Sequence, residues 1–196
     1  MIENEKAYNE LRNDENDNKP EDQVMRGLIH IYCGDGKGKT TAAAGLAVRS
    51  AGCGMKVLFA QFMKSGPAGE INAFKKIDGI TVLRGEGDTK FAWEMDEREK
   101  AAACRMQDVI LQKAAAWAED YDMVVLDEAV GTCGAGFLEL KKLYDFLDHK
   151  PEKLEVVLTG RNPADGLIER ADYVSEIKKI KHPYDRGICA RKGIEQ

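Results

Sequence analysis

The sequence predicts an α/β fold in which a six-stranded, mostly parallel sheet carries helices on both faces. Short apolar runs alternate with longer segments of helical period, which is typical of parallel strands joined by right-handed helical crossovers. The runs are apolar at successive positions, as expected of strands that are covered on both faces. The strands are expected at 28–33, 56–62, 80–84, 123–128, 154–160 and 173–177.

Five segments between these runs have the composition and spacing of helices. The helices are expected at 39–52, 69–77, 95–120, 138–150 and 163–171. The run AVGTCGAG at 129–136 follows the fourth strand, is small and glycine-rich, and is interpreted as a loop. Ligands of such a sheet bind beyond the carboxyl ends of its strands, so the residues that follow each strand are the candidates for a site.

The charge distribution divides the chain into an arm and a body. Residues 1–22 carry eight acidic and three basic side chains, a net charge of −5 that equals the charge of the whole chain. Few large apolar groups are present there, so we expect a flexible acidic N-terminal arm, followed by a single domain at 23–196. Because the acidic and basic residues of that domain balance, no basic field indicates nucleic acid as a partner.

The cysteines indicate a reducing compartment. The chain has five of them, at Cys33, Cys53, Cys104, Cys133 and Cys189. They are far apart and form no C-x-x-C pair, so neither a zinc site nor a disulfide framework is expected. Together with a polar N-terminus that lacks an apolar signal region, they predict a cytoplasmic protein. No run approaches the roughly 18 apolar residues of a membrane span, so no membrane partner is expected.

A phosphate-binding loop follows the first strand and opens the first helix. It reads GDGKGKTT and comprises Gly34, Asp35, Gly36, Lys37, Gly38, Lys39, Thr40 and Thr41. Its glycines let main-chain N–H groups approach phosphate oxygens, Lys39 adds positive charge, and the Thr40 hydroxyl can bind Mg²⁺. The usual pattern requires glycine at Cys33, so this loop is one residue short, and transfer of the γ-phosphoryl group does not follow from it. A glycine-rich turn without a ligand is the alternative.

Two carboxylates end the fourth strand and complete a nucleotide site. Asp127 or Glu128 can hold Mg²⁺ (or Mn²⁺), directly or through water, and Thr40 is the third expected metal ligand. The alternative is a pair of surface carboxylates. Arg161 follows the fifth strand, where a planar guanidinium can hold a triphosphate, although a surface arginine beside a helix would look the same in sequence.

These residues, with several others in the same order, resemble the P-loop type of ATP:corrinoid adenosyltransferases, also called cob(I)alamin adenosyltransferases. The resemblance covers residue 26 to the C-terminus and includes VLFAQFMKSG (57–66), FAWE (91–94), MVVLDE (123–128), VVLTGRNP (156–163), LIERADYVSEI (167–177) and KHPYDRGICARKGIE (181–195). It implies a RecA-like P-loop fold and a homodimer in which the N-terminal arm covers the corrinoid site.

The resemblance also implies a reaction. Reduced Co(I) of cobalamin or another corrinoid attacks the 5′ carbon of ATP, and inorganic triphosphate leaves, so the short loop holds a leaving group. Phe91 and Trp93 would lie under the corrin ring and displace its lower axial ligand, which makes Co(II) easier to reduce. With Lys39 and Glu128 they are the expected catalytic residues; ordinary core or rim packing is the alternative for the two aromatics.

Further residues are assigned only through the resemblance. Gln61, Lys64 and Glu70 match positions that line the nucleotide or corrinoid site, and a flavodoxin-type protein is the implied electron donor.

His182, which precedes a proline, is interpreted as a structural or surface residue and not as a cobalt ligand. Since Co(I) is a strong nucleophile, no general base is required.

Two other functions remain open at this point. One is a P-loop phosphotransferase or ATPase, in which Glu128 would position a nucleophile and ADP would be the product. The other is a nucleotide sensor or corrinoid-delivery module that binds ATP without chemistry. The products distinguish them, because only the adenosyltransferase releases inorganic triphosphate with an adenosylated corrinoid.

Overall fold

The computed structural model describes residues 26–64, 66, 68–85 and 94–195, so the expected arm at 1–22 lies outside the described residues. All six expected strands are present, each within one residue of its expected bounds. The elements are β1 (Ile29–Cys33), α2 (Lys39–Gly52), β2 (Val57–Gln61), α3 (Gly69–Phe74), β3 (Ile80–Arg84), α4 (Glu97–Trp117), the 3₁₀ helix η2 (Ala118–Asp120), β4 (Met123–Asp127), α5 (Ala129–Gly134), α6 (Leu140–Asp148), β5 (Glu155–Thr159), α7 (Asp165–Ile168), β6 (Tyr173–Glu176) and the 3₁₀ helix η3 (Pro183–Arg186).

The strands form one sheet in the order β3-β2-β4-β5-β1-β6. Every pairing between neighbours is parallel, which confirms the predicted fold class. The central strands β2 and β4 are buried along their whole length, whereas the four residues of the edge strand β6 are exposed. Strand β5 lies between β1 and β4 in the sheet. The segment that follows β1 and the segment that follows β4 therefore start next to the end of β5, one at each of its long edges.

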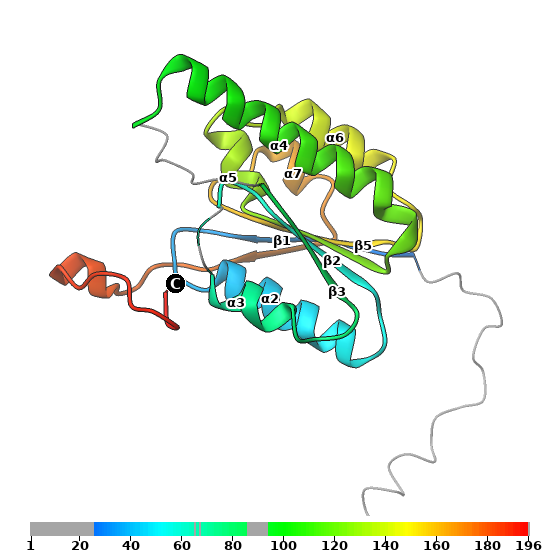
Figure 1. Ribbon diagram of the computed structural model, residues 1–196, viewed down its shortest axis with the longest axis horizontal. Helices are drawn as coiled ribbons and strands as arrows, with labels where there is room; N and C mark the ends of the chain where they lie inside the picture. The colour runs from blue at the N-terminus through cyan, green and yellow to red at the C-terminus, as the bar shows by residue number, and fades with distance from the viewer. Residues whose placement is uncertain (1–25, 65, 67, 86–93, 196) are drawn as a thin grey trace, which may run out of the picture.

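Helices cover both faces of the sheet (Figure 1). Helices α2 and α3 lie on one face, where Phe59, Val125 and Val157 pack with alanines of α2. Helices α4, α5, α6 and α7 lie on the opposite face, where Leu58 and the other alternate strand residues form the larger core. None of the helices in the described part of the chain combines the length and the apolar character that a membrane span needs.

The prediction of a loop at 129–136 is wrong, because Ala129–Gly134 forms helix α5. This helix packs against the end of β5 at very close range: a Cβ atom on Gly160 would lie 2.3 Å from the backbone nitrogen of Gly131. Small residues are therefore required here to bring a helix against a strand end. Composition alone could not distinguish that requirement from the flexibility of a loop.

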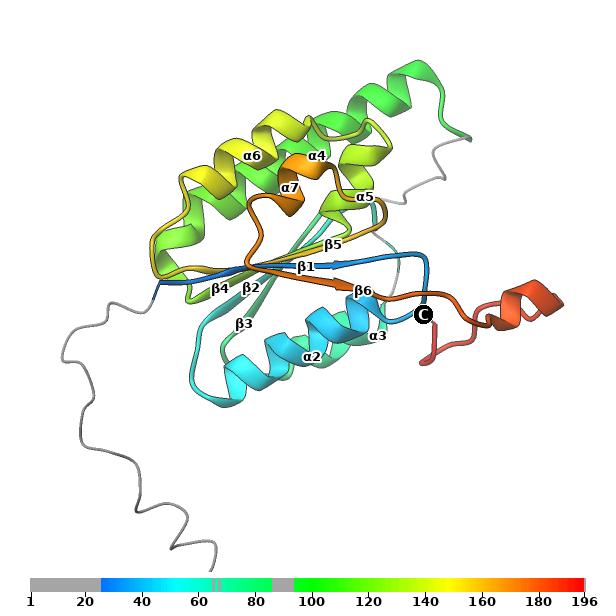
Figure 2. The ribbon, with the colours of Figure 1, turned by 180° about the vertical axis from the view of Figure 1, so that it is seen from behind.

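The carboxyl ends of β1, β4 and β5 meet where α2 and α5 begin, on opposite faces of the sheet (Figure 2). The chain leaves β6 at this same edge, forms η3 and returns, so that its C-terminal end lies near the start of α2. We call residues 177–195 the C-terminal tail. The tail and the strand ends together enclose the candidate site.

Candidate active site

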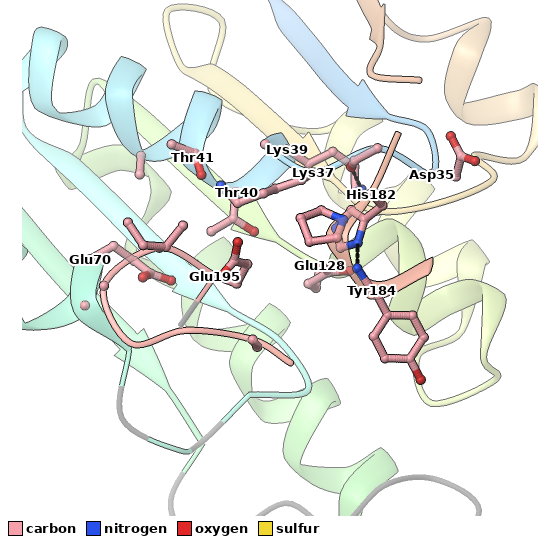
Figure 3. Close-up of a pocket in the computed structure, with 18 of the residues that line it drawn as sticks. Asp35, Lys37, Lys39, Thr40, Thr41, Glu70, Glu128, His182, Tyr184 and Glu195 are labelled. Atoms are coloured by element: carbon pink, nitrogen blue, oxygen red, sulfur yellow. Dashed lines mark hydrogen bonds between the residues drawn. The ribbon is translucent and has the colours of Figure 1, made fainter. Parts of the chain in front are cut away.

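A cavity of about 500 Å³ lies at the carboxyl edge of the sheet (Figure 3). Three parts of the chain line it: the loop residues 35–41, the residues Lys64, Glu70, Glu128 and Arg161 beyond the strands, and tail residues 182–184, 188–190 and 193–195. Glu70 and Asp35 lie at opposite ends of the cavity. The cavity thus brings together most of the residues that the sequence nominated, whereas Gly34, Gln61 and Asp127 lie outside its lining.

The glycines of the loop serve two different purposes. Gly38 has φ of 124°, a backbone conformation that favours glycine, and it precedes the first residue of α2. Gly34 and Gly36 lie against the tail: a Cβ atom on Gly34 would be 2.4 Å from the carbonyl oxygen of Ile177, and the Gly36 N–H donates to that oxygen at 2.8 Å. Tail packing therefore explains their small size directly.

Asp35 connects the loop to the tail. Its Oδ1 accepts a hydrogen bond from the Lys179 backbone N–H at 2.9 Å. This bond stabilises the charged carboxylate and lowers the pKa of Asp35 below its ordinary value. In the structure, Asp35 thus holds the tail beside the loop.

Positive charge is concentrated at the start of α2. Lys39 is 8% exposed, and its Nζ donates to the Gly36 carbonyl oxygen at 2.8 Å. Burial lowers the pKa of Lys39, although the Glu128 carboxylate opposes the shift. Lys37, Thr41 and Arg161 also border the cavity. The N–H groups at the start of a 14-residue helix add partial positive charge, so the part of the cavity beside the loop suits an anion.

Asp127 is the centre of a buried hydrogen-bond network and is fully buried. Its Oδ1 accepts from the Thr40 hydroxyl at 2.8 Å and from the Thr159 hydroxyl at 2.7 Å, and its Oδ2 accepts from Gln61 Nε2 at 2.9 Å. Because Thr40 donates its proton to Asp127, the lone pairs of the Thr40 oxygen are left for a cation. The geometry makes Asp127 a group that orients Thr40.

Glu128 presents its carboxylate to the cavity from a left-handed backbone with φ of 63°. Its backbone N–H donates to the Thr159 hydroxyl at 2.8 Å, so Thr159 connects the two acidic residues. Within the described residues this carboxylate makes no hydrogen bond or ion pair. A Cβ atom on Gly131 would lie 3.0 Å from Glu128 Oε2, so the glycine of α5 leaves room for it. Glu128 is therefore available to a ligand.

Gln61, Lys64 and Glu70 lie beside this network. Gln61 is fully buried, and its Nε2 also approaches Glu70 Oε1 at 3.4 Å, whereas its Oε1 has no partner in the described part of the structure. Lys64 Nζ lies 3.4 Å from Asp127 Oδ2 and 3.4 Å from Thr40 Oγ1. Lys64 and Glu70 face the cavity, and Gln61 lies behind them.

The arrangement fits a magnesium ion bound together with phosphates. No group of three or more His, Cys, Asp or Glu side chains that could hold a metal occurs among the described residues. Mg²⁺, however, commonly takes only one or two protein carboxylates and completes its shell with substrate phosphates and water. The Thr40 hydroxyl and the Glu128 carboxylate meet this requirement.

Sequence reasoning did not identify the C-terminal tail as a wall of the site. His182, Tyr184 and Glu195 border the cavity, and His182 Nδ1 accepts from the Tyr184 backbone N–H at 3.2 Å (Figure 3). Bonds to Arg191 lower the pKa of Glu195 to about 2. The stretch KHPYDRGICARKGIE was the available signal, but no residue type in it specifies contact with a distant loop. The expected corrin-binding aromatics Phe91 and Trp93 lie outside the described residues.

Comparison with known proteins gives matches over nearly the whole chain. The model of the family described as ATP:corrinoid adenosyltransferase BtuR/CobO/CobP matches residues 25–196. A corrinoid adenosyltransferase of Escherichia coli (strain K12) is 37% identical over 177 residues, which cover 88% of this chain and 87% of the relative. The corrinoid adenosyltransferase of Pseudomonas aeruginosa is 35% identical, over 87% of this chain and 84% of the relative. That of Salmonella typhimurium is 36% identical, over 88% of this chain and 87% of the relative. A solved KaiC-like protein of Pyrococcus horikoshii OT3 aligns with a TM-score of 0.47 and 16% identity over 80% of this chain and 75% of its own.

Proposed function

The chain belongs to the ATP:corrinoid adenosyltransferase family, and we propose that its cavity grips the triphosphate of ATP while the adenosyl group passes to cobalt. ATP and a corrinoid are the substrates of this family, and adenosyl transfer between them is its activity.

The observation that carries the proposal is the collection of cationic groups around the short loop that lines the cavity. Lys37, Lys39 and Arg161 border the cavity together with the start of α2. When the C5′–O bond breaks, its electron pair goes to the triphosphate, so negative charge grows where these groups lie. Fixed cations and oriented N–H groups then stabilise the transition state more than ground-state ATP.

Thr40 and Glu128 are the residues that we propose as direct ligands of Mg²⁺ or Mn²⁺, with Asp127 orienting Thr40 from behind. The full burial of Asp127 and its absence from the cavity lining support this division. When bound with ATP, the cation would neutralise charge on the triphosphate oxygens. The Glu128 carboxylate makes no hydrogen bond or ion pair among the described residues, which supports its role as a ligand.

The nucleophile comes from the substrate, so the protein contributes alignment and electrostatics. The lone pair of Co(I) forms the new bond to C5′ as the triphosphate departs, and no proton needs to move. His182, the histidine that borders the cavity, accepts a backbone hydrogen bond through Nδ1, which suits a structural role.

The remaining parts of the proposal rest on the resemblance. Phe91 and Trp93 lie under the corrin ring, the enzyme acts as a homodimer whose arm covers that ring, and a flavodoxin-type protein supplies the electron that forms Co(I). A cytoplasmic location is proposed because all five cysteines are free.

Absorbance spectroscopy of chemically reduced cobalamin tests the proposed role of the loop. With ATP and Mg²⁺, the Co(I) spectrum should convert to that of the alkylated product, and Lys39→Ala should slow the conversion by about 100-fold, the scale of a lost transition-state contact. Conversion at the wild-type rate in Lys39→Ala would overturn the proposed grip on the triphosphate. ADP formation without alkylation would favour the phosphotransferase alternative.

A further inference from the structure

We propose that Lys64 occupies the cation position in the nucleotide-free enzyme and withdraws when triphosphate arrives, so that metal binding depends on ATP. This inference rests on the proposed function, because it takes Thr40 as a ligand of the cation. Lys64 would then determine that ATP binds before the metal, in addition to any contact that it makes with the substrate.

The position of the ammonium group carries the argument. Lys64 Nζ lies 3.4 Å from Thr40 Oγ1 and 3.4 Å from Asp127 Oδ2. Thr40 Oγ1 is also the proposed ligand of Mg²⁺, whose bonds to oxygen are about 2.0–2.1 Å long. A divalent cation bound there would face a second positive charge at close range. The two cations therefore oppose each other as long as Lys64 keeps this position.

The buried carboxylate of Asp127 explains why a cation is needed there when no metal is bound. Asp127 is fully buried, and Thr40, Thr159 and Gln61 give it neutral donors only. Lys64 supplies its one ion pair within the described part of the chain. Since a buried charge without a counter-charge is strongly unfavourable, the ammonium stabilises the network until a metal replaces it.

The surroundings of Lys64 allow it to leave. Its side chain is 39% exposed, both contacts are long, and the residue lies in the segment after β2, outside the strand. It also borders the same cavity as Lys37 and Lys39. A triphosphate in that cavity offers the ammonium a new partner, and the flexible lysine stem can reach it. The arrival of ATP thus frees the cation position and brings phosphate oxygens to complete the metal shell.

Electron paramagnetic resonance of Mn²⁺ tests the exchange without turnover or corrinoid, because bound Mn²⁺ loses the signal of the free ion. In the absence of nucleotide, Lys64→Met should bind Mn²⁺ at least about 10-fold more tightly than wild type, because the competing charge is gone. Lys64→Arg, which keeps the charge, should remain close to wild type. Lys37→Met is the matched control: it removes one lysine from the same cavity, but not one that contacts Thr40 or Asp127, and should change the affinity by less than about threefold.

Equal nucleotide-free affinities of wild type and Lys64→Met would overturn the inference, as would an equal gain in Lys37→Met. Titrations of wild type with ATP, after subtraction of the Mn²⁺ that ATP binds without protein, separate this result from a failure of the proposed function. Mn²⁺ binding with ATP, combined with equal affinities without it, would remove only the role of Lys64. Absence of Mn²⁺ binding in every form, with ATP present, would remove the proposed metal site as well.

Discussion

Thr159→Val removes one hydroxyl group that joins the two acidic residues of the site. Thr159 is fully buried; its Oγ1 donates to Asp127 at 2.7 Å and accepts from the Glu128 backbone N–H at 2.8 Å. Loss of a hydrogen bond to a charged group costs about 1.5–3 kcal/mol, and a buried N–H without an acceptor costs about 1–3 kcal/mol. We therefore expect the free energy of unfolding to fall by about 3–5 kcal/mol, although valine has nearly the shape of threonine.

Urea unfolding of the two matched variants measures this effect. Thr159→Ser keeps the hydroxyl and loses only a buried methyl group, so its cost should be about 1 kcal/mol. The valine variant should also bind ATP and metal more weakly than the serine variant, because Glu128 and Thr40 lose their common anchor. If the two variants unfold at the same urea concentration with equal slopes, the reasoning about this network is refuted.

Three further predictions follow from backbone geometry and charge. Glu128→Gly should be more stable to urea than Glu128→Ala by about 1 kcal/mol, because both lose the carboxylate but only glycine tolerates φ of 63° without strain; equal stability would contradict this. Gly36→Ala should weaken ATP binding, measured by calorimetry, because the new Cβ atom would lie 2.7 Å from the carbonyl oxygen of Ile177 in the tail. Gly45 has open space around it, so Gly45→Ala should leave ATP binding unchanged and stabilise α2 by about 1 kcal/mol. Burial lowers the pKa of the Lys39 ammonium. Affinity for inorganic triphosphate should therefore be full at neutral pH and should fall as rising pH deprotonates Lys39, at a lower pH than an exposed lysine would require. The Lys39→Met variant should bind triphosphate weakly at every pH and show no such fall.

The strands and the phosphate loop could be predicted because their signals are local. Each strand is a continuous apolar run, and GDGKGKTT places its glycines, lysines and helix start within eight residues. The sheet order was not predictable in this way, since β5 separates β1 from β4 through contacts between distant segments. The sequence of helix α5 predicts a loop because the small residues that allow close packing also occur in loops.

The structure brings many of the nominated residues to one cavity, but the connections among them could not be predicted. The sequence nominates both Asp127 and Glu128 as metal ligands and only Glu128 as catalytic, whereas the structure buries Asp127 and leaves Glu128 facing the cavity. Thr159, which joins them, lies in the matched stretch VVLTGRNP, but no local pattern assigns it a contact with both acidic residues. The contact of Lys179 with Asp35 spans 144 positions, so no local pattern could have placed the tail beside the loop.

Phosphorus NMR of a completed reaction with ATP, Mg²⁺ and chemically reduced cobalamin tests most directly whether the loop holds a leaving group. If the loop holds the whole triphosphate as the leaving group, inorganic triphosphate should accumulate in an amount equal to the adenosylated corrinoid, and no ADP should form. Formation of ADP and orthophosphate in step with ATP loss, with the corrinoid unchanged, would contradict the account.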